Sequence, residues 1–228
     1  MNRHALYLML AAAALLCSCQ SGRVRIEGRI VGADDRQVYL ERITPLARSV
    51  VDSAAMDEGG NYRFDVRGVA ATPMLYDLIC DGERIPLYLS GGDRLTVNSV
   101  GSVVRNYTVA GSEESELLRR FYQPFVAGLQ RLDSIASTPG GQPLTQEQRQ
   151  TMAREYTREY RRIKREQFRF IIENKSSLAA VYALYQRLPG DRYLFNLQSD
   201  AIYYRTVADA LAARYPESPY LTLSLIHI

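Results

Sequence analysis

The stretch that decides the fold is MLYDLICDGERIPLYLSGGDRLTV, residues 74–97. Apolar residues occupy every second position in its first part, namely Met74, Tyr76, Leu78 and Cys80. This period of two is the pattern of a β-strand with one face in a core. The segments Asp81-Gly82 and Gly91-Gly92-Asp93 supply residues that tolerate positive φ between the apolar runs. The stretch therefore predicts consecutive antiparallel strands joined by tight turns.

The same alternation extends toward the N-terminus. Short runs repeat it at Val24, Ile26 and Ile30, then at Val38 and Leu40, then at Tyr62, Phe64 and Val66. The segment Glu58-Gly59-Gly60-Asn61 supplies a further turn. Short alternating strands separated by turn signals are typical of a β-sandwich, and we expect about seven to nine strands over residues 24–111.

The pattern changes after Gly111. Ser112 can cap a helix whose apolar residues recur at helical spacing, at Leu117, Leu118, Phe121, Phe125 and Leu129. Segment 137–143, which is rich in Pro and Gly, ends this helix. Thr145 and Gln148 then form a capping box that opens a second helix, which we expect to end near Asn174.

Two shorter helices are expected after that, from Ser177 to Leu188 and from Asp200 to Tyr215. Pro189-Gly190 and Pro216 would stop them. The predicted fold class is therefore α+β in two segments: an N-terminal antiparallel β-sandwich is followed by a small all-α helical array over residues 112–220.

Residues 1–19 read as an export signal. The apolar run from Ala5 to Leu16 is too short to span a bilayer, which takes about 20 apolar residues. It ends in Leu16-Cys17-Ser18-Cys19, which resembles a bacterial lipobox with Cys19 as the acceptor of the lipid. The small Ser18 favours Cys19 over Cys17, which follows the bulky Leu16. The alternative is an ordinary secretory signal with two incidental cysteines.

The lipid would fix the location of the protein. Residues 20–23 would form a short tether, and the segment after Cys19 lacks the acidic cluster that is associated with surface display of lipoproteins. We therefore expect a protein of the cell envelope, anchored to a membrane through the lipid on Cys19 and facing the periplasm. The choice between inner and outer membrane, and the oligomeric state, stay open.

Histidine is nearly absent from the chain. The two histidines are His4, inside the export segment, and His227, beside the last residue. Ser-His-Asp catalysis, Cys-His catalysis and His-ligated zinc all need a histidine that the body of the chain lacks. No cofactor motif is present either, so we predict no catalytic residue, no cofactor and no metal site in this chain.

The charge distribution argues against nucleic acid as a partner. The 28 Lys and Arg residues and 25 Asp and Glu residues are interspersed, whereas a nucleic-acid surface needs clustered basic residues. Six arginines between residues 154 and 169 could meet an anionic partner. Glu155, Glu159 and Glu166 lie at pairing distance from them, which favours a solvated helix face.

Three other groups of residues have both a structural and a functional interpretation. Cys80, the single thiol outside the export segment, shares a strand face with Met74, which favours a buried apolar role over a reactive one. Asp57, Glu58 and Asn61 could hold calcium, but their spacing favours a plain turn. A run of tyrosines could line a groove, although packing between helices is the preferred interpretation. These tyrosines are Tyr182, Tyr185, Tyr193, Tyr203 and Tyr204.

Several weak motifs in a fixed order resemble one known arrangement. They are Ile26–Ile30, Val38–Leu40, Asp52-Ser53, Gly60–Phe64, Ile85–Leu89 with Gly91–Asp93, and Tyr107–Ser112. Together they resemble the uncharacterised N-terminal β-domain and helical linker of Bacteroides-type lipoprotein thiol-disulfide oxidoreductases, whose C-terminal domain is thioredoxin-like and related to peroxiredoxins. The resemblance covers most of residues 24–220.

The resemblance implies a longer natural protein. In that family the linker closes with a motif like Tyr215–Tyr220, and a thioredoxin fold with a Cys-x-x-Cys pair follows. Here the chain continues with Leu223–Ile228, which matches the translation of a transposon end used in sequencing libraries. We therefore expect residues 223–228 to be a non-native tail, and the redox domain and its redox partner protein to belong to the missing part.

Three classes of function follow. The preferred class is a non-catalytic accessory region that positions the missing thioredoxin-like domain for disulfide exchange. The alternative is a stand-alone lipoprotein that binds a peptide or glycan. A carboxylate-based hydrolase using Asp34 with Asp35, or Asp57 with Glu58, is disfavoured because adjacent residues of a strand point to opposite faces. Whether the intact protein is an enzyme stays open.

Overall fold

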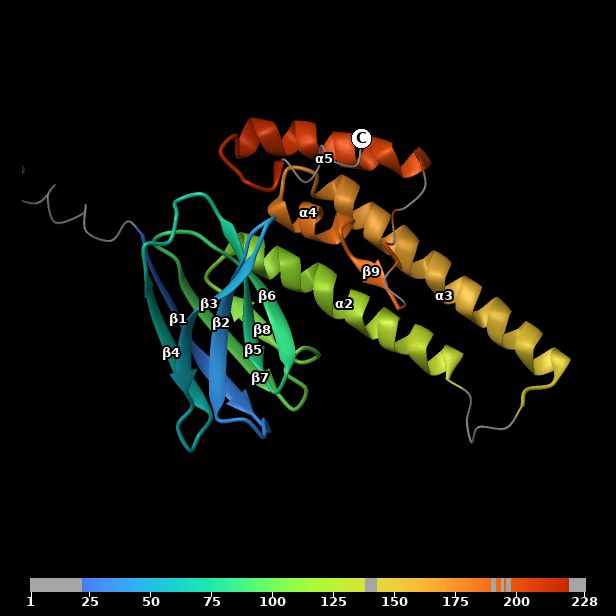
Figure 1. Cartoon of the computed structure of the whole chain (residues 1–228), viewed down its shortest axis with the longest axis horizontal. Coiled ribbons are helices and arrows are strands. Elements are labelled where there is room, and N and C mark those ends of the chain that lie inside the picture. Colours follow the sequence, from blue (N-terminus) through green and yellow to red (C-terminus); the bar gives the residue numbers. More distant parts are fainter. Residues whose placement is uncertain (1–21, 138–142, 190–191, 194, 196–197, 222–228) are drawn as a thin grey trace, which may run out of the picture.

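The computed structural model describes residues 22–137, 143–189, 192–193, 195 and 198–221. Two four-stranded sheets form a sandwich, and helices pack beside one of the sheets (Figure 1). The protein is therefore α+β, with the sandwich first and the helices after it, and the predicted fold class is confirmed. The predicted lipid acceptor Cys19 and the tail 223–228 lie outside the described residues.

The sandwich is built from short strands that are divided between the two sheets. The strands are β1 (Arg23–Val31), β2 (Gln37–Ile43), β3 (Arg48–Ala55), β4 (Asn61–Arg67), β5 (Met74–Cys80), β6 (Glu83–Leu89), β7 (Arg94–Val100) and β8 (Thr108–Ala110). One sheet has the order β4-β1-β7-β8 and the other has the order β3-β2-β5-β6. The expectation of purely antiparallel strands is wrong at one place, because β7 pairs with β1 in parallel. A parallel pair needs a long crossover connection, and here the whole second sheet provides it.

The first core lies between the two sheets. Alternate residues of each strand point inward, so that Ile26, Phe64, Leu78 and Leu87 are all within 1% of full burial. Burying one such side chain contributes about 1.5–3 kcal/mol. Gly28 permits close approach of β1 and β7, because a Cβ atom at this position would lie 1.8 Å from the carbonyl oxygen of Val97.

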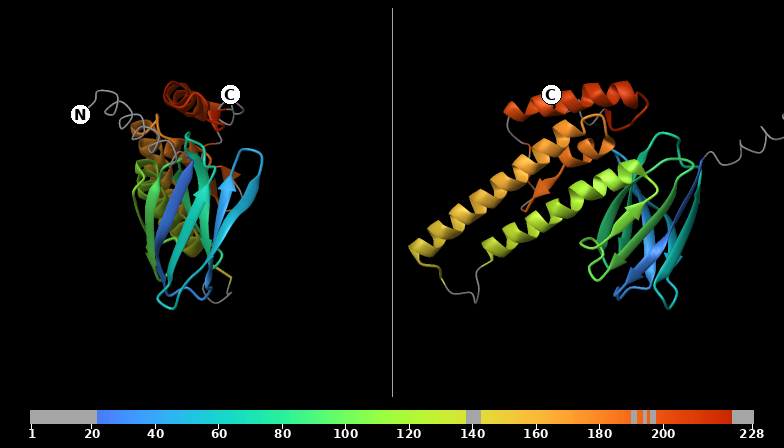
Figure 2. Two further views of the ribbon diagram at one scale, coloured as in Figure 1. Left: turned by 90° about the vertical axis from the view of Figure 1, so that its left-hand side faces the viewer. Right: turned by 180° about the vertical axis from the view of Figure 1, so that it is seen from behind.

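Two long helices follow the sandwich as predicted. Helix α2 (Glu113–Ala136) begins after Ser112, whose side chain accepts a hydrogen bond from the backbone N–H of Ser115. Helix α3 (Gln146–Glu173) begins with the predicted capping box of Thr145 and Gln148. Figures 1 and 2 show α3 returning antiparallel along α2.

The third predicted helix is shorter than expected. Helix α4 (Leu178–Leu184) ends four residues before Leu188, and β9 (Arg187–Leu188) instead pairs with β10 (Arg192–Tyr193). Leu188 precedes Pro189, and the residue before a proline is driven out of the helical region into an extended conformation. Helix α5 (Ala201–Arg214) agrees with the prediction and follows a 3-10 turn, η3 (Gln198–Asp200).

A second core joins the helices to the sandwich. Leu75 and Tyr88 point from the outer face of the β3-β2-β5-β6 sheet and pack with Leu118 of α2, Val181 of α4 and Leu211 of α5. Figure 2 shows the resulting three layers from the side and from behind: one sheet, the second sheet, and the helices. Strands β5 and β6 are consequently buried on both faces.

Candidate binding site

A cavity of about 400 Å³ opens where the outer face of the β3-β2-β5-β6 sheet meets α2 and α4. The sheet contributes Ile43, Leu75 and Tyr88, and α2 contributes Phe125 and neighbouring apolar residues. The polar residues are Thr44, Arg48, Gln186 and Arg187. The cavity therefore combines an apolar body with a few polar groups, as binding sites for small ligands do.

Tyrosines form much of the cavity wall. Five of them line it: Tyr88, Tyr122, Tyr182, Tyr185 and Tyr220. The rings meet edge to face, with centroids 6.3 Å apart for Tyr88 and Tyr220 and 5.7 Å apart for Tyr122 and Tyr182. This geometry is the favoured one for aromatic pairs, and it holds the rings in place.

Hydrogen bonds fix two of these tyrosines. The hydroxyl of Tyr88 donates to the carbonyl oxygen of Leu178 at 2.8 Å. The hydroxyl of Tyr220 accepts from the backbone N–H of Leu75 at 2.8 Å and donates to the carbonyl oxygen of Ile43 at 2.7 Å. Tyr220 thus bridges the ends of β2 and β5 from the far end of the chain.

Burial keeps four tyrosines of the wall protonated at neutral pH. Burial raises the pKa of Tyr88 and of Tyr182 well above the ordinary value, and burial also raises the pKa of Tyr122. For Tyr220, burial raises the pKa to about 12. These four tyrosines are therefore neutral, and they offer a ligand uncharged aromatic surface.

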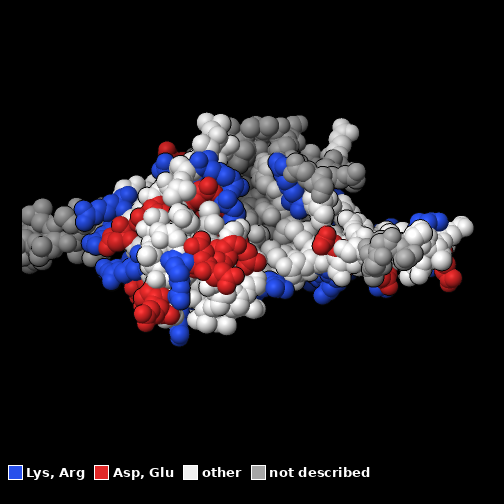
Figure 3. Space-filling model, turned by 60° about the horizontal axis from the view of Figure 1, so that its bottom comes forward, with Lys and Arg blue, Asp and Glu red and all other residues white. Residues whose placement is uncertain are grey.

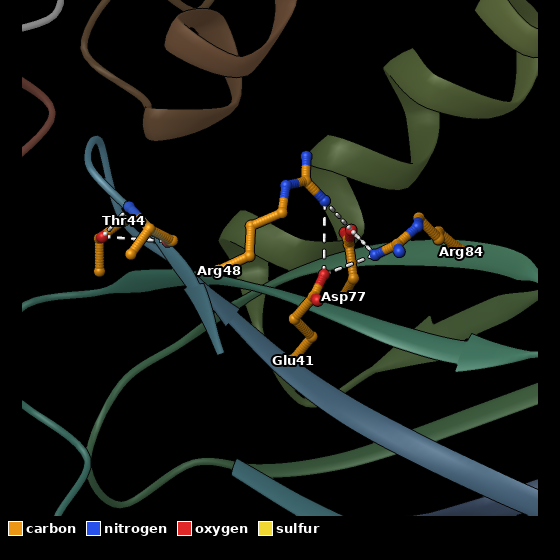
Figure 4. A network of polar contacts seen from close by, with 6 residues as sticks. Glu41, Thr44, Arg48, Asp77 and Arg84 are labelled. Carbon is orange, nitrogen blue, oxygen red and sulfur yellow. Dashed lines mark hydrogen bonds and ion pairs between the residues drawn. The ribbon is translucent and has the colours of Figure 1, made fainter. Parts of the chain in front are cut away.

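An ionic network holds Arg48 at the mouth of the cavity (Figure 4). The carboxylate of Asp77 lies 3.3 Å from Arg48 and 3.2 Å from Arg84. Glu41 bridges the same two arginines, at 3.4 Å from Arg48 and 2.5 Å from Arg84. Burial raises the pKa of Asp77, while Arg84 and Arg48 oppose the rise. Both carboxylates are engaged by arginines, which makes this network a positioning device rather than an acid-base pair.

The predicted run of tyrosines separates into two groups. Tyr182 and Tyr185 line the cavity, as the groove interpretation requires. Tyr203 and Tyr204 instead pack against other rings, as the interpretation of packing between helices requires. The ring centroids lie 4.8 Å apart for Tyr203 and Phe168 and 5.7 Å apart for Tyr204 and Tyr185. The side chain of Tyr193 lies outside what the structure describes.

Cys80 lies in the core between the two sheets. Its side chain is 1% exposed, and burial raises the pKa of its thiol to about 11. A thiol with such a pKa holds its proton at neutral pH, so it is a poor nucleophile. The prediction of a buried apolar role for Cys80 is confirmed.

The paired carboxylates of the hydrolase hypothesis lie in turns and not on strands, which corrects the reason given against them. Asp34 and Asp35 precede β2, and their backbone N–H groups donate to the carboxylate of Asp81. The carboxylate of Asp57 accepts from the N–H groups of Gly59 and Asn61, as a plain turn requires.

Acidic side chains gather on the surface of the sandwich in Figure 3. The cavity opens beside Ile43 and Thr44, at the opposite end of β2 from Asp34 and Asp35.

The glutamates of α3 pair with fewer arginines than expected. Glu159 and Glu166 both form ion pairs with Arg162, and the shortest nitrogen–oxygen distance is 2.6 Å in each pair. Glu159 also reaches Arg131 of α2 at 3.4 Å. The arginines Arg154, Arg158, Arg161 and Arg165 have no acidic partner among the described residues. All four are exposed, in agreement with the predicted solvated helix face.

Sequence reasoning missed Tyr88, Tyr220 and Arg48 as residues of the site. A signal for Tyr88 existed, because Ile85–Leu89 is a continuous apolar run, which indicates a strand buried on both faces. Tyr220 lies 132 residues after Tyr88 in the sequence, and their meeting depends on the tertiary fold.

Two features are absent from the described residues. None of the helices in this part of the chain has the length and apolar character needed to cross a membrane. Within the same residues, no three His, Cys, Asp or Glu side chains are arranged to hold a metal ion.

Comparisons with known proteins give only partial similarities. No protein-family model and no curated protein matches the chain. Among solved structures, (S)-allantoin synthase matches 45% of this chain at 13% identity with a TM-score of 0.29. A "putative cell adhesion protein" from Bacteroides fragilis matches 41% at 12% identity (TM-score 0.28), and one from Bacteroides ovatus matches 41% at 10% identity (TM-score 0.25). The matches span 49%, 46% and 44% of those chains, about half of their length, and TM-scores this low support no argument about function.

Proposed function

We propose that the protein is a non-catalytic binding module of the cell envelope, and that its cavity holds a peptide or glycan. The observation that supports this proposal is the cavity of about 400 Å³ with its wall of tyrosines and its polar mouth. Tyrosine rings give a large contact area at low cost in conformational entropy. Arg48, Gln186 and Arg187 would supply directional hydrogen bonds to the polar atoms of such a ligand.

A cavity-filling variant tests the binding function. Val126 lies half-buried on α2 and lines the cavity, so Val126→Trp would occupy the space that the ligand needs. Val100→Trp is the matched control, because Val100 is 62% exposed on β7 of the other sheet. Binding would be measured by saturation-transfer NMR with a panel of short peptides and cell-wall oligosaccharides.

We expect at least one probe to bind the wild type and Val100→Trp, and to lose its signal with Val126→Trp. Probes that bind all three proteins equally would place binding elsewhere. A panel without any binder would contradict a peptide- or glycan-binding role.

A second candidate function is that of an anchored platform, and the docking of Tyr220 favours it. Because the Tyr220 hydroxyl is bonded to β2 and β5, any domain that follows residue 221 would begin from a fixed point on the sandwich. With a lipid on Cys19, such a platform would hold a thioredoxin-like domain near the membrane on its periplasmic side. Sequencing the source locus beyond the codon for Thr222 tests this, since a frame without a Cys-x-x-Cys domain would contradict it.

The anchor has its own test with an internal control. Cys19→Ser should abolish incorporation of radiolabelled palmitate and release the protein from the membrane fraction, because one thiol carries the lipid. Cys17→Ser should leave both unchanged. Equal labelling of the two variants would contradict the assignment of Cys19.

A further inference from the structure

The charged residues that line the cavity of about 400 Å³ are both arginines, Arg48 and Arg187. In the part of the chain that the structure describes, no Asp or Glu side chain is among the lining residues. Glu41 and Asp77 contact Arg48, but neither of them lines the cavity. A ligand therefore meets positive charge at the mouth, which favours an anionic group.

One edge of the Arg48 guanidinium is open to such a group. Both contacts with carboxylates are made through a single nitrogen, Nη1. The other two nitrogens, Nε and Nη2, have no partner among the described residues. Figure 4 shows one nitrogen of this guanidinium pointing away from Glu41 and Asp77, toward the helices. Because Nε and Nη2 share one edge of the planar group, they can donate two parallel hydrogen bonds to one carboxylate.

The tyrosine wall offers a ligand ring surface and few hydrogen bonds. The hydroxyls of Tyr88 and Tyr220 already bond to backbone groups of the protein. Those of Tyr122 and Tyr182 bond to each other. A sugar, which carries hydroxyls around its ring, would leave several of them without a partner here, and this costs free energy. An aromatic or large apolar side chain instead gains from leaving water.

We propose that the cavity holds the C-terminal residue of a peptide, with its aromatic or large apolar side chain against the tyrosines and its free carboxylate on Nε and Nη2 of Arg48. This inference rests on the proposed binding function and chooses the peptide over the glycan. An internal segment of a peptide has no main-chain carboxylate, so the terminus is the part that Arg48 recognises. The cavity of about 400 Å³ lies near the lower end of the range for small-ligand sites, roughly 300–1,000 Å³, which suits one or two residues.

Two probes that differ in a single group test the carboxylate. They are N-acetyl-alanyl-phenylalanine and its C-terminal amide, titrated into the protein by isothermal titration calorimetry at neutral pH. We expect the acid to bind about tenfold more tightly than the amide, because a bidentate pair with a partly exposed arginine is worth about one charged hydrogen bond.

Arg48→Gln should abolish this preference, so that acid and amide bind equally and with the affinity that the wild type shows for the amide. The variant should fold, because the Arg48 side chain is 55% exposed. Arg84→Gln is the matched control, since Arg84 contacts the same two carboxylates but does not line the cavity. It should keep the tenfold preference. A preference that survives Arg48→Gln, or that is lost equally in Arg84→Gln, would overturn the role of the Arg48 edge.

The remaining outcomes separate this inference from the function on which it rests. Equal binding of acid and amide by the wild type would overturn the carboxylate and leave the binding function intact. Glucuronic acid, a sugar with a carboxylate, tests the apolar part by competition with the peptide acid. Equal affinity of the two would overturn the choice of peptide over glycan. Binding of neither peptide nor sugar would overturn the binding function and this inference with it.

Discussion

Hydrogen bonds from single tyrosine hydroxyls connect the sandwich to the segment that follows it, and Tyr220 is the clearest case. Its hydroxyl completes the pairing of β2 and β5 where the register ends at Ile43 and Leu75. Removing the oxygen leaves the buried N–H group of Leu75 and the partly buried carbonyl of Ile43 without their partner. Such groups cost free energy when they are unpaired.

Tyr220→Phe should therefore lower the free energy of unfolding by about 1–3 kcal/mol. Urea denaturation followed by circular dichroism measures the loss. The control is Tyr39→Phe, because Tyr39 is 39% exposed on β2, and its change should stay within about 0.5 kcal/mol. Equal effects of the two substitutions would show that the Tyr220 hydroxyl contributes nothing.

Sequence patterns predicted individual residues well where one strand face decides the outcome. Cys80 was expected in the core because it shares the alternation of Met74, Tyr76 and Leu78, and it lies there. Leu75 and Tyr88 lie on the other face of the same sheet. Only the packing of the helices on that face explains their burial. A strand covered on both faces loses the alternation on which the prediction rests.

At the scale of elements, an ion pair between Arg131 and Glu159 joins α2 to α3. Glu159 of α3 is 7% exposed and accepts from Arg162, with Arg131 of α2 nearby. The hydrogen bonds from Arg162 are the main cause that lowers the pKa of the Glu159 carboxyl, and Arg131 adds to them. The folded state therefore favours the ionised carboxylate.

Glu159→Gln should lower the free energy of unfolding at pH 7 by about 1–2 kcal/mol, since the partners are partly exposed. Because the folded pKa is depressed, this contribution is present above the ordinary carboxyl value of 4.5 and is lost as the pH falls through the folded pKa. The gap between wild type and variant should then close at low pH in chemical denaturation. A gap that stays constant down to acid pH would contradict an ionic contribution.

Element boundaries were predictable where a local signal exists. The caps at Ser112 and Thr145 gave the starts of α2 and α3, because capping depends on residues three positions apart. The end of α4 was missed by four residues, and the β9–β10 pair was missed altogether. Strands of two residues are too short to show a period, and Pro189 acts on the residue before it as well as on those after it.

At the scale of the whole molecule, the sandwich and the helices share one of the two cores. Leu75 and Tyr88 of the sheet pack in the same cluster as residues of α2, α4 and α5. The order of the two segments could be predicted from the change in periodicity at Gly111. Their packing could not, because contacts between segments depend on which surfaces fit each other.

We expect the chain to unfold in a single cooperative transition because of this shared core. Leu75→Ala should lower stability by about 2–5 kcal/mol and shift the helical signal at far-ultraviolet wavelengths and the tyrosine signal in the near ultraviolet together. Val100→Ala, at an exposed position, should shift neither. Two separate transitions, with only the helical one moved, would contradict a shared core.

The bonds of Tyr220 also set the timing of folding. They join residues 177 and 145 positions apart, so the pairing of β2 and β5 is completed only when almost the whole described chain is available. Contacts of such long range form slowly, because a large loop must close first. We propose that this protein belongs to the cell envelope, and a chain that is exported unfolded gains from such a delay. Its N-terminal half leaves the ribosome long before Tyr220 can close the structure, so the chain stays competent for passage.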